Sequence, residues 1–259
     1  MKRIAGLDAQ PPSLTLFHND PGIENTWDAL RNHTAYMDLK TALVVQQHGL
    51  CAYCEIDLVP DDTSIEHVVP RSDPAQGAAL SCDADNMLAI CRGGSNVPVY
   101  GPKVRSPDLS RVLPPVERNL SCGQAKGNRP ASDFLDPRRV PGDPSLMNIE
   151  ESGRIGSEQK ACESHAIDPA VVDNHIVGLG LNVERLRIRR EAIWLELAAS
   201  FSIFADLPEE DRADHLTMLA ESQLLPNRDG RLAPFFTTAR SFFGPLAEAI
   251  LAAPPQAWI

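Results

Sequence analysis

Two cysteines, a glutamate and a histidine lie within residues 51–70, which read CAYCEIDLVPDDTSIEHVVP. Cys51 and Cys54 are separated by two residues, a spacing that suits one edge of a tetrahedral zinc site. Such a site needs two further ligands. We choose Cys91, which ends NMLAIC, and Cys122, which opens CGQAKGN, because each lies at the edge of a predicted structured element. The spacing therefore predicts a structural Zn²⁺ site.

The remaining two of the six cysteines are assigned differently. Cys82 precedes Cys91 by a short segment and is an alternative zinc ligand in its place. Cys162 lies in an unrelated region, where a single cysteine commonly packs as a small buried hydrophobic residue. A redox role for Cys51 and Cys54 is disfavoured because no βαβ pattern surrounds them. A zinc transcription factor is also disfavoured, since its cysteines would be expected to present a recognition helix.

Glu66 and His67 end the short apolar run TSIEHVVP, which predicts a β-strand. If the thiols hold zinc, this acid and this imidazole are free for chemistry. Neutral imidazole titrates near neutral pH, which suits proton transfer. The commoner arrangement for such a dipeptide is an exposed glutamate beside a partly buried histidine, so the surrounding motifs must decide between the two interpretations.

The elements that would position these residues are mainly helical. Residues 25–49 predict one long amphipathic helix, with Asn25 as its N-cap and Gly49 as its end. Its apolar stripe would consist of Trp27, Leu30, Met37, Val44 and Val45. We expect this helix to pack against the zinc region.

Helical patterns return in the last hundred residues. Asp168 and Pro169 predict the start of one helix, and Asn182 is the expected N-cap of the next. Two further helical segments begin at Pro208 and at Arg240. The C-terminal part of the chain is therefore predicted to be a helical module.

Composition and charge limit the possible classes of protein. The 259 residues are 43% hydrophobic, enough for a buried core, and no run approaches the roughly 18 apolar residues of a membrane span. The first residues lack the apolar stretch of a secretory signal, so we expect a cytoplasmic protein. A net charge of −11 argues against strong sequence-independent binding of nucleic acid, although residues 92–139 carry nine basic and only four acidic side chains.

The segments CAYCE, IEHVVPRSD, DNMLAIC and CGQAKGN together resemble the HNH endonucleases. With LDPR and GLGLNVERLRIRR, the chain is similar to the HNH subunits of retron-associated and Septu-type antiphage systems. The resemblance implies a ββα-metal core held by a four-cysteine zinc site, metal-dependent cleavage of nucleic acid, and an ATPase partner of the ABC/SMC-like class. It implies no membrane association.

We therefore expect an α+β, mostly helical fold. Residues 1–145 would contain the N-terminal helix and the ββα-metal nuclease core, and residues 146–259 would form a helical module that docks the partner.

The resemblance also implies roles for single residues. His67 would be the general base that takes a proton from water, and Glu66 would ligate one catalytic Mg²⁺ or Mn²⁺. Asn86 would hold the loop that carries His67 through backbone hydrogen bonds, although asparagine is equally favoured in a plain turn. Three basic residues would contact nucleic acid: Arg71, Lys126 and Arg129.

Gly123 departs from the family pattern, which has an asparagine or histidine directly after the last cysteine. A glycine has no side chain that could ligate a metal, so a neighbour would replace it, and we prefer Asn128 to Gln124. Three functions remain open on this basis: a nuclease on DNA, which we favour, a nuclease on RNA, and a zinc-stabilised interaction module without catalysis.

Overall fold

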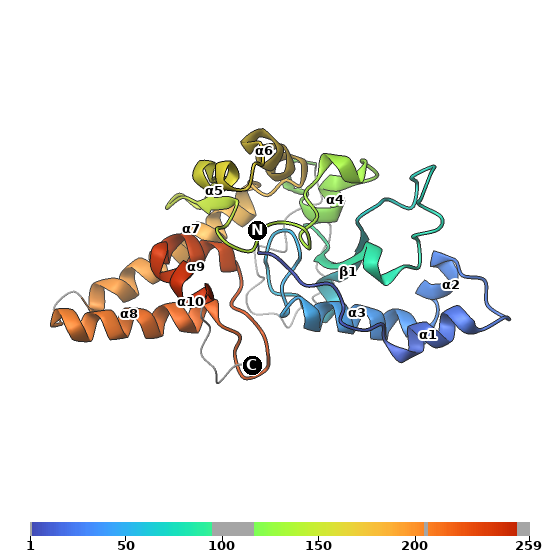
Figure 1. The fold of residues 1–259 in the computed structure, drawn as a ribbon, viewed down its shortest axis with the longest axis horizontal. Helices are drawn as coiled ribbons and strands as arrows, with labels where there is room; N and C mark the ends of the chain where they lie inside the picture. The colour runs from blue at the N-terminus through green and yellow to red at the C-terminus, as the bar shows by residue number, and fades with distance from the viewer. Residues whose placement is uncertain (1, 95–116, 205–206, 253–259) are drawn as a thin grey trace, which may run out of the picture.

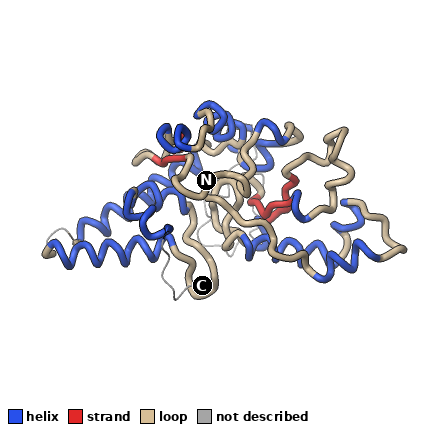
Figure 2. The backbone as a smooth tube through the Cα atoms, in the orientation of Figure 1, coloured by secondary structure: helices blue, strands red, loops and turns tan. Residues whose placement is uncertain are grey.

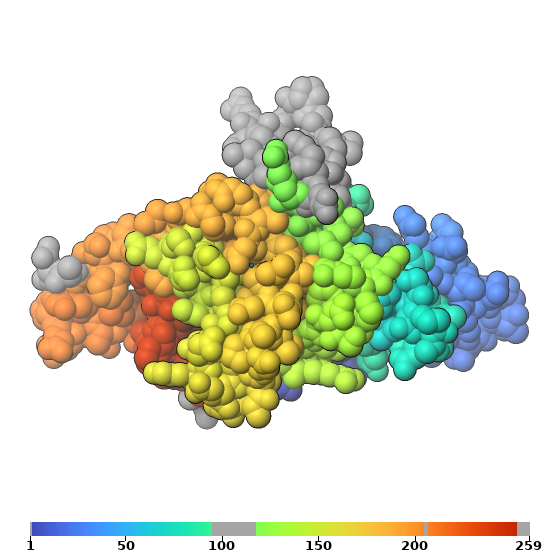
Figure 3. Space-filling model, turned by 90° about the horizontal axis from the view of Figure 1, so that it is seen from above, coloured from blue at the N-terminus to red at the C-terminus, as the bar shows by residue number. Residues whose placement is uncertain are grey.

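The computed structural model describes residues 2–94, 117–204 and 207–252. Part of the basic window lies outside the described residues, including Lys103, Arg105 and Arg111. Helices and loops dominate, and the strands are short (Figure 2). The N-terminal helices and the C-terminal helices lie at opposite ends of an elongated molecule (Figures 1 and 3). The mixed, mostly helical fold class is confirmed.

The first sheet consists of two antiparallel strands, β1 (Thr63–His67) and β2 (Met87–Cys91). Their register pairs His67 with Met87 and Glu66 with Leu88. The short helix α4 (Cys122–Lys126) contacts β2, although many residues separate them in the sequence. Both predicted structured elements at Cys91 and Cys122 are therefore present, and they lie together.

The predicted single N-terminal helix is wrong. The chain forms α1 (Pro12–Asn19), α2 (Trp27–Arg31) and α3 (Thr34–Gln46). The chain leaves the helical conformation at His33, whose backbone is extended and whose ring Nδ1 accepts a hydrogen bond from the Ala35 N–H. Thr26, not Asn25, caps α2. A side-chain cap at each start explains why one apolar pattern contains two helices.

The predicted apolar stripe is also partly wrong. Leu30 is buried as expected, whereas Met37 and Val45 are 53% and 70% exposed. The residues that α3 buries are Ala35, Leu39 and Leu43. The break before α3 resets the phase of the helix, so a stripe extrapolated from Trp27 does not continue along it.

The C-terminal region contains a hairpin that its sequence did not predict, β3 (Met147–Ile149) paired with β4 (Ile155–Ser157). Five described helices follow the short α5 (Gln159–Ser164) and pack on one another or on the hairpin. Their bounds are α6 (Pro169–Gly178), α7 (Glu184–Ile203), α8 (Glu209–Leu224), α9 (Phe236–Phe243) and α10 (Pro245–Ala252). Asp168 caps α6 as predicted. None of the helices in the described part of the chain is long and apolar enough to cross a bilayer.

The predicted cap of α7 is wrong, because Asn182 binds another element. Its side-chain oxygen accepts from the Ile155 N–H at 2.9 Å, and its amide donates to the Ile155 carbonyl at 2.8 Å. Asn182 thus fixes β4 to the start of α7. The final helical segment is divided by Gly244, whose φ of 51° interrupts the helix between α9 and α10.

Buried apolar residues form two clusters. The larger one extends from Ile4 to Phe235 and includes all four predicted zinc ligands. The smaller one joins α7, α8, α9 and α10. Because the larger cluster contains residues on both sides of position 145, the core is continuous there, and the division into residues 1–145 and 146–259 stays a prediction.

Candidate functional site

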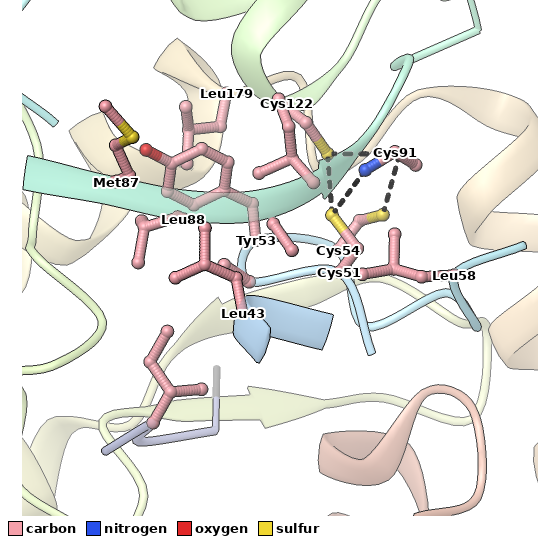
Figure 4. Packing of buried hydrophobic residues seen from close by; sticks show 14 of the residues in the cluster. Leu43, Cys51, Tyr53, Cys54, Leu58, Met87, Leu88, Cys91, Cys122 and Leu179 are labelled. Carbon is pink, nitrogen blue, oxygen red and sulfur yellow. Dashed lines mark hydrogen bonds between the residues drawn. The ribbon is translucent and has the colours of Figure 1, made fainter. Parts of the chain in front are cut away.

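The four cysteines chosen from the sequence lie together in the core (Figure 4). Their sulfur atoms are all within 4.8 Å of one another. The Sγ–Sγ distances are 3.7 Å for Cys51 and Cys122, 3.6 Å for Cys54 and Cys91, and 3.7 Å for Cys91 and Cys122. A zinc ion with Zn–S bonds of about 2.3 Å gives a tetrahedron with edges of about 3.8 Å. The cluster could therefore hold a metal such as zinc.

Three separate segments supply these sulfurs. Cys51 and Cys54 lie on a tight turn after α3, in which the Cys51 N–H donates to the Ile56 carbonyl at 2.8 Å. Cys91 ends β2 and Cys122 begins α4. The Cys91 N–H also donates to the Cys51 sulfur at 3.3 Å, a contact that favours a thiolate there. Cys82 is outside the cluster.

The cluster needs a cation if more than one of its thiols is to ionise, because, despite burial, the neighbouring thiols lower the pKa of Cys51, whereas the pKa values of Cys91 and Cys122 are raised. Burial raises the pKa of the Cys122 thiol, and contacts with the other three thiols raise it further. Several thiolates at such distances repel one another, and no water solvates them because all four cysteines are buried. A divalent ion offsets both the repulsion between thiolates and their loss of solvation, so the four sulfur ligands fit a structural metal.

Glu66 and Lys126 form a largely buried ion pair. Lys126 Nζ donates to Glu66 Oε1 and to the backbone carbonyl of His67, both at 2.8 Å. The Lys126 side chain is 2% exposed. Burial raises the pKa of the Glu66 carboxyl, and the charge of Lys126 opposes that shift. Lys126 therefore holds the end of β1 through these two hydrogen bonds. Its ammonium group is buried and already has two partners, so it is poorly placed for the predicted contact with phosphate.

His67 is held in one tautomer. Its Nε2 lies 3.0 Å from the backbone carbonyl oxygen of Ser81, which can only accept, so Nε2 carries the proton of the neutral ring. Nδ1 then has the free lone pair, and no described residue provides it with a hydrogen-bond partner. Burial lowers the pKa of the His67 imidazole below its ordinary 6.5, and the charges of Arg71 and Lys126 lower it further against the opposing Ser81 hydrogen bond. The ring is therefore neutral near pH 7.

Asn86 closes the loop that follows His67. Its side-chain oxygen accepts from the Val69 N–H at 2.8 Å. Its amide donates to the carbonyls of Val69 at 3.0 Å and Leu80 at 3.2 Å. All three bonds are to the backbone of the segment between β1 and β2, as expected for a residue that holds this loop.

A cleft of about 700 Å³ opens over Glu66 and His67. Apart from Glu66 itself, the charged residues that line it are all basic: Arg31, Lys40, Arg71, Arg92 and Lys126. Gln124 and Asn128, the two residues considered as replacements for the ligand missing at Gly123, also line the cleft. Such a cleft suits a polyanion.

Arg129 is not among the lining residues. Its guanidinium donates to the carbonyls of Ala125, Lys126 and Gly178, and it lies over the Phe134 ring at 4.7 Å. These contacts join the end of α4 to the end of α6. Arg129 thus packs between these two helices, and its contact with phosphate stays a prediction.

Gly123 faces the Glu66 carboxylate. A Cβ atom at this position would lie 2.5 Å from Glu66 Oε2 and 2.5 Å from Ile90 Cδ1. Any side chain here would therefore displace the carboxylate. The departure from the family pattern has a physical reason, since the glycine makes room for Glu66 against α4.

Two residues near the site were not assigned to it from the sequence. Trp27 was assigned only to an apolar stripe, yet its ring contacts His67 with a centroid separation of 4.5 Å. Glu55 was not assigned a role, yet it is buried, and its carboxylate accepts from the Lys2 and Thr237 N–H groups, each at 2.7 Å. The acid directly after Cys54 was the only available signal for Glu55.

Comparison with known proteins gives one relevant similarity. No family model matches the chain. A protein of Escherichia coli named "Retron Ec83 putative HNH endonuclease" is 28% identical over 193 residues, which cover 65% of this chain and 70% of the relative. The similarity supports the resemblance to the HNH family and suggests nuclease activity.

Proposed function

We propose that this protein is a metal-dependent endonuclease of the HNH type that hydrolyses phosphodiester bonds, with DNA as the favoured substrate. The observation that carries the proposal is the state of His67: a neutral imidazole with Nε2 bound to the Ser81 carbonyl and Nδ1 free, next to Glu66 in a basic cleft. That is the arrangement that a general base for water attack requires.

His67 performs the proton transfer in this proposal. Nδ1 takes a proton from the water that attacks phosphorus, and the imidazolium that forms donates through Nε2 to Ser81. Asn86 keeps the loop in place during the step by its bonds to Val69 and Leu80.

Glu66 fits a hard divalent cation, because both its oxygen atoms are ligands that Mg²⁺ and Mn²⁺ accept. Oε1 is bound to Lys126, whereas Oε2 lies against Gly123 and has no such partner among the described residues. When bound, the ion would stabilise negative charge at the scissile phosphate and on the leaving 3′ oxygen. We assign Asn128 as a further oxygen ligand from the loop after α4.

The substrate and the partner follow from charge and from resemblance. Arg71, with Arg31 and Lys40 of the cleft, would contact the phosphates. Because the whole chain carries a charge of −11, a second protein would supply much of the affinity for nucleic acid. The resemblance and the retron named in the relative's description support a role in bacterial antiphage defence beside an ABC/SMC-like ATPase, docked on residues 146–259. Zinc in the four-cysteine cluster would hold the frame together.

The test is cleavage of plasmid DNA and of total RNA by the purified chain in Mg²⁺ or Mn²⁺, with and without an ATPase of the proposed ABC/SMC-like class. His67→Ala should abolish cutting, and His215→Ala, on the exposed side of α8, should not. Cutting of RNA alone would replace the DNA assignment. If the folded, metal-bound protein cuts neither DNA nor RNA, the nuclease proposal is overturned and the non-catalytic interaction module is favoured.

A further inference from the structure

The ring of His67 packs against a residue from outside its own sheet. Trp27, the first residue of α2, meets His67 edge to face, with ring centroids 4.5 Å apart and an angle of 78° between the ring planes. Edge-to-face packing is a preferred arrangement of aromatic rings and resists rotation of either one. The contact therefore joins α2 to the end of β1.

The Ser81 hydrogen bond alone does not fix the imidazole. It fixes the position of one ring atom, Nε2, and leaves the tilt of the ring plane to the side chains packed around it. The direction of the Nδ1 lone pair depends on that tilt. Trp27 is the aromatic neighbour that His67 has among the described residues.

Trp27 is itself held firmly. The Thr26 hydroxyl accepts from the Ala29 N–H at 3.3 Å and caps α2, and Leu30 of the same helix is fully buried. The Tyr36 ring meets the indole edge to face at 5.7 Å, and the Arg71 guanidinium lies over it at 5.4 Å. These contacts hold the indole in place, so that it can orient the His67 imidazole packed against it.

We infer that Trp27 is a positioning residue for catalysis: its indole sets the plane of the His67 imidazole and so keeps Nδ1 directed at the attacking water. The inference rests on the proposed nuclease function of His67. Because Trp27 acts through His67, its loss slows the chemical step, whereas any change in KM would come from Arg71, whose guanidinium lies over the indole. Misdirection of a base by a fraction of an ångström costs about tenfold to a hundredfold in rate.

The test measures kcat and KM for relaxation of supercoiled plasmid by the full chain and by its Trp27 variants, in Mg²⁺. Trp27→Ala should lower kcat about tenfold or more, and Trp27→Phe, which keeps a ring edge, should recover most of that loss in kcat. Trp194→Ala removes an indole from α7, away from the cleft, and should keep the kcat of the folded parent. Parent kcat in Trp27→Ala, a rise in KM alone, or no recovery in Trp27→Phe would each overturn the inference.

A second measurement separates this inference from the nuclease proposal. In ¹⁵N spectra, the His67 ring of the parent should give one tautomer, with the proton on Nε2. Trp27→Leu keeps an apolar side chain but no ring, and its His67 signals should broaden or divide as the imidazole samples several orientations. An unchanged single signal would overturn the positioning role even if His67 proves essential. An altered signal would support it even if plasmid is not the substrate.

Discussion

At the candidate site, the Glu66 carboxylate occupies the space that a side chain at position 123 would fill. The two residues must therefore be interpreted together. The sequence alone placed Glu66 and His67 next to each other and identified Gly123 as a departure. It could not show that Glu66 fills the space above the glycine, because that contact depends on how α4 packs against the sheet. For the same reason, the contact between Trp27 and His67 was not predictable from the sequence.

We predict that Gly123→Ala lowers cleavage about tenfold to a hundredfold, because the new Cβ would displace the Glu66 carboxylate that lies 2.5 Å away. Adding Glu66→Asp, which shortens the acid, should restore part of the rate. Gly156→Ala is the control, since nothing lies within 4 Å of a Cβ there. Initial rates of cleavage check the prediction. A Gly123→Ala enzyme as fast as the Gly156→Ala control would show that the carboxylate need not lie against α4.

At the scale of elements, the four cysteines connect a turn, a strand and a helix. Their spacing and positions were sufficient to choose them from the sequence, because metal ligands recur at the edges of structured elements. The break before α3 and the β3–β4 hairpin were not predictable in this way. His33 and Asn182 determine these features through side-chain hydrogen bonds, which periodicity does not reveal.

We predict that Cys91→Ser loses the bound metal and unfolds more easily, whereas Cys82→Ser keeps one metal ion per chain. The reason is that Cys91 belongs to the sulfur cluster and Cys82 does not. Zinc content by elemental analysis, together with thermal unfolding, checks both variants. Loss of the metal from Cys82→Ser, with its retention in Cys91→Ser, would show that Cys82 and not Cys91 is the metal ligand.

Glu55 connects the cysteine turn to α9. Its carboxylate accepts from the Thr237 N–H and hydroxyl, and its backbone carbonyl accepts from the Phe235 N–H at 2.7 Å. We predict that Glu55→Ala lowers the free energy of unfolding by about 3 kcal/mol, since several buried donors lose a charged acceptor. Urea unfolding measures the change, with the exposed Glu163→Ala as control. Equal stability of the two variants would contradict this role.

At the scale of the whole molecule, the larger apolar cluster extends from the candidate nuclease site to α5, α6 and the start of α7, and a buried histidine packs against it. His175 is fully buried, and its Nδ1 accepts from the Leu135 N–H at 3.0 Å. Burial lowers the pKa of His175 to about 3. Below pH 6.5, His175 binds a proton in the unfolded chain but stays neutral in the folded chain. The free energy of unfolding therefore decreases as the pH is lowered from 6.5 to about 3.

We predict that this residue contributes up to about 1.4 kcal/mol of destabilisation per pH unit across that window. His175→Gln keeps an acceptor for Leu135 and removes the titration, so its stability should fall less steeply between about pH 6 and about pH 4. Urea unfolding over that range compares the slopes, with His215→Gln as control. Parallel curves for the parent and His175→Gln would contradict the assignment.

The measurement that tests the central claim most directly is cleavage in ¹⁸O-labelled water, with mass analysis of the new ends and His67→Ala alongside. If His67 activates water against phosphorus, the parent should incorporate one ¹⁸O into a newly formed phosphate end and release a 3′-hydroxyl, and His67→Ala should form neither. Unlabelled ends, or labelled ends formed equally fast without His67, would contradict the assignment of His67 as the general base.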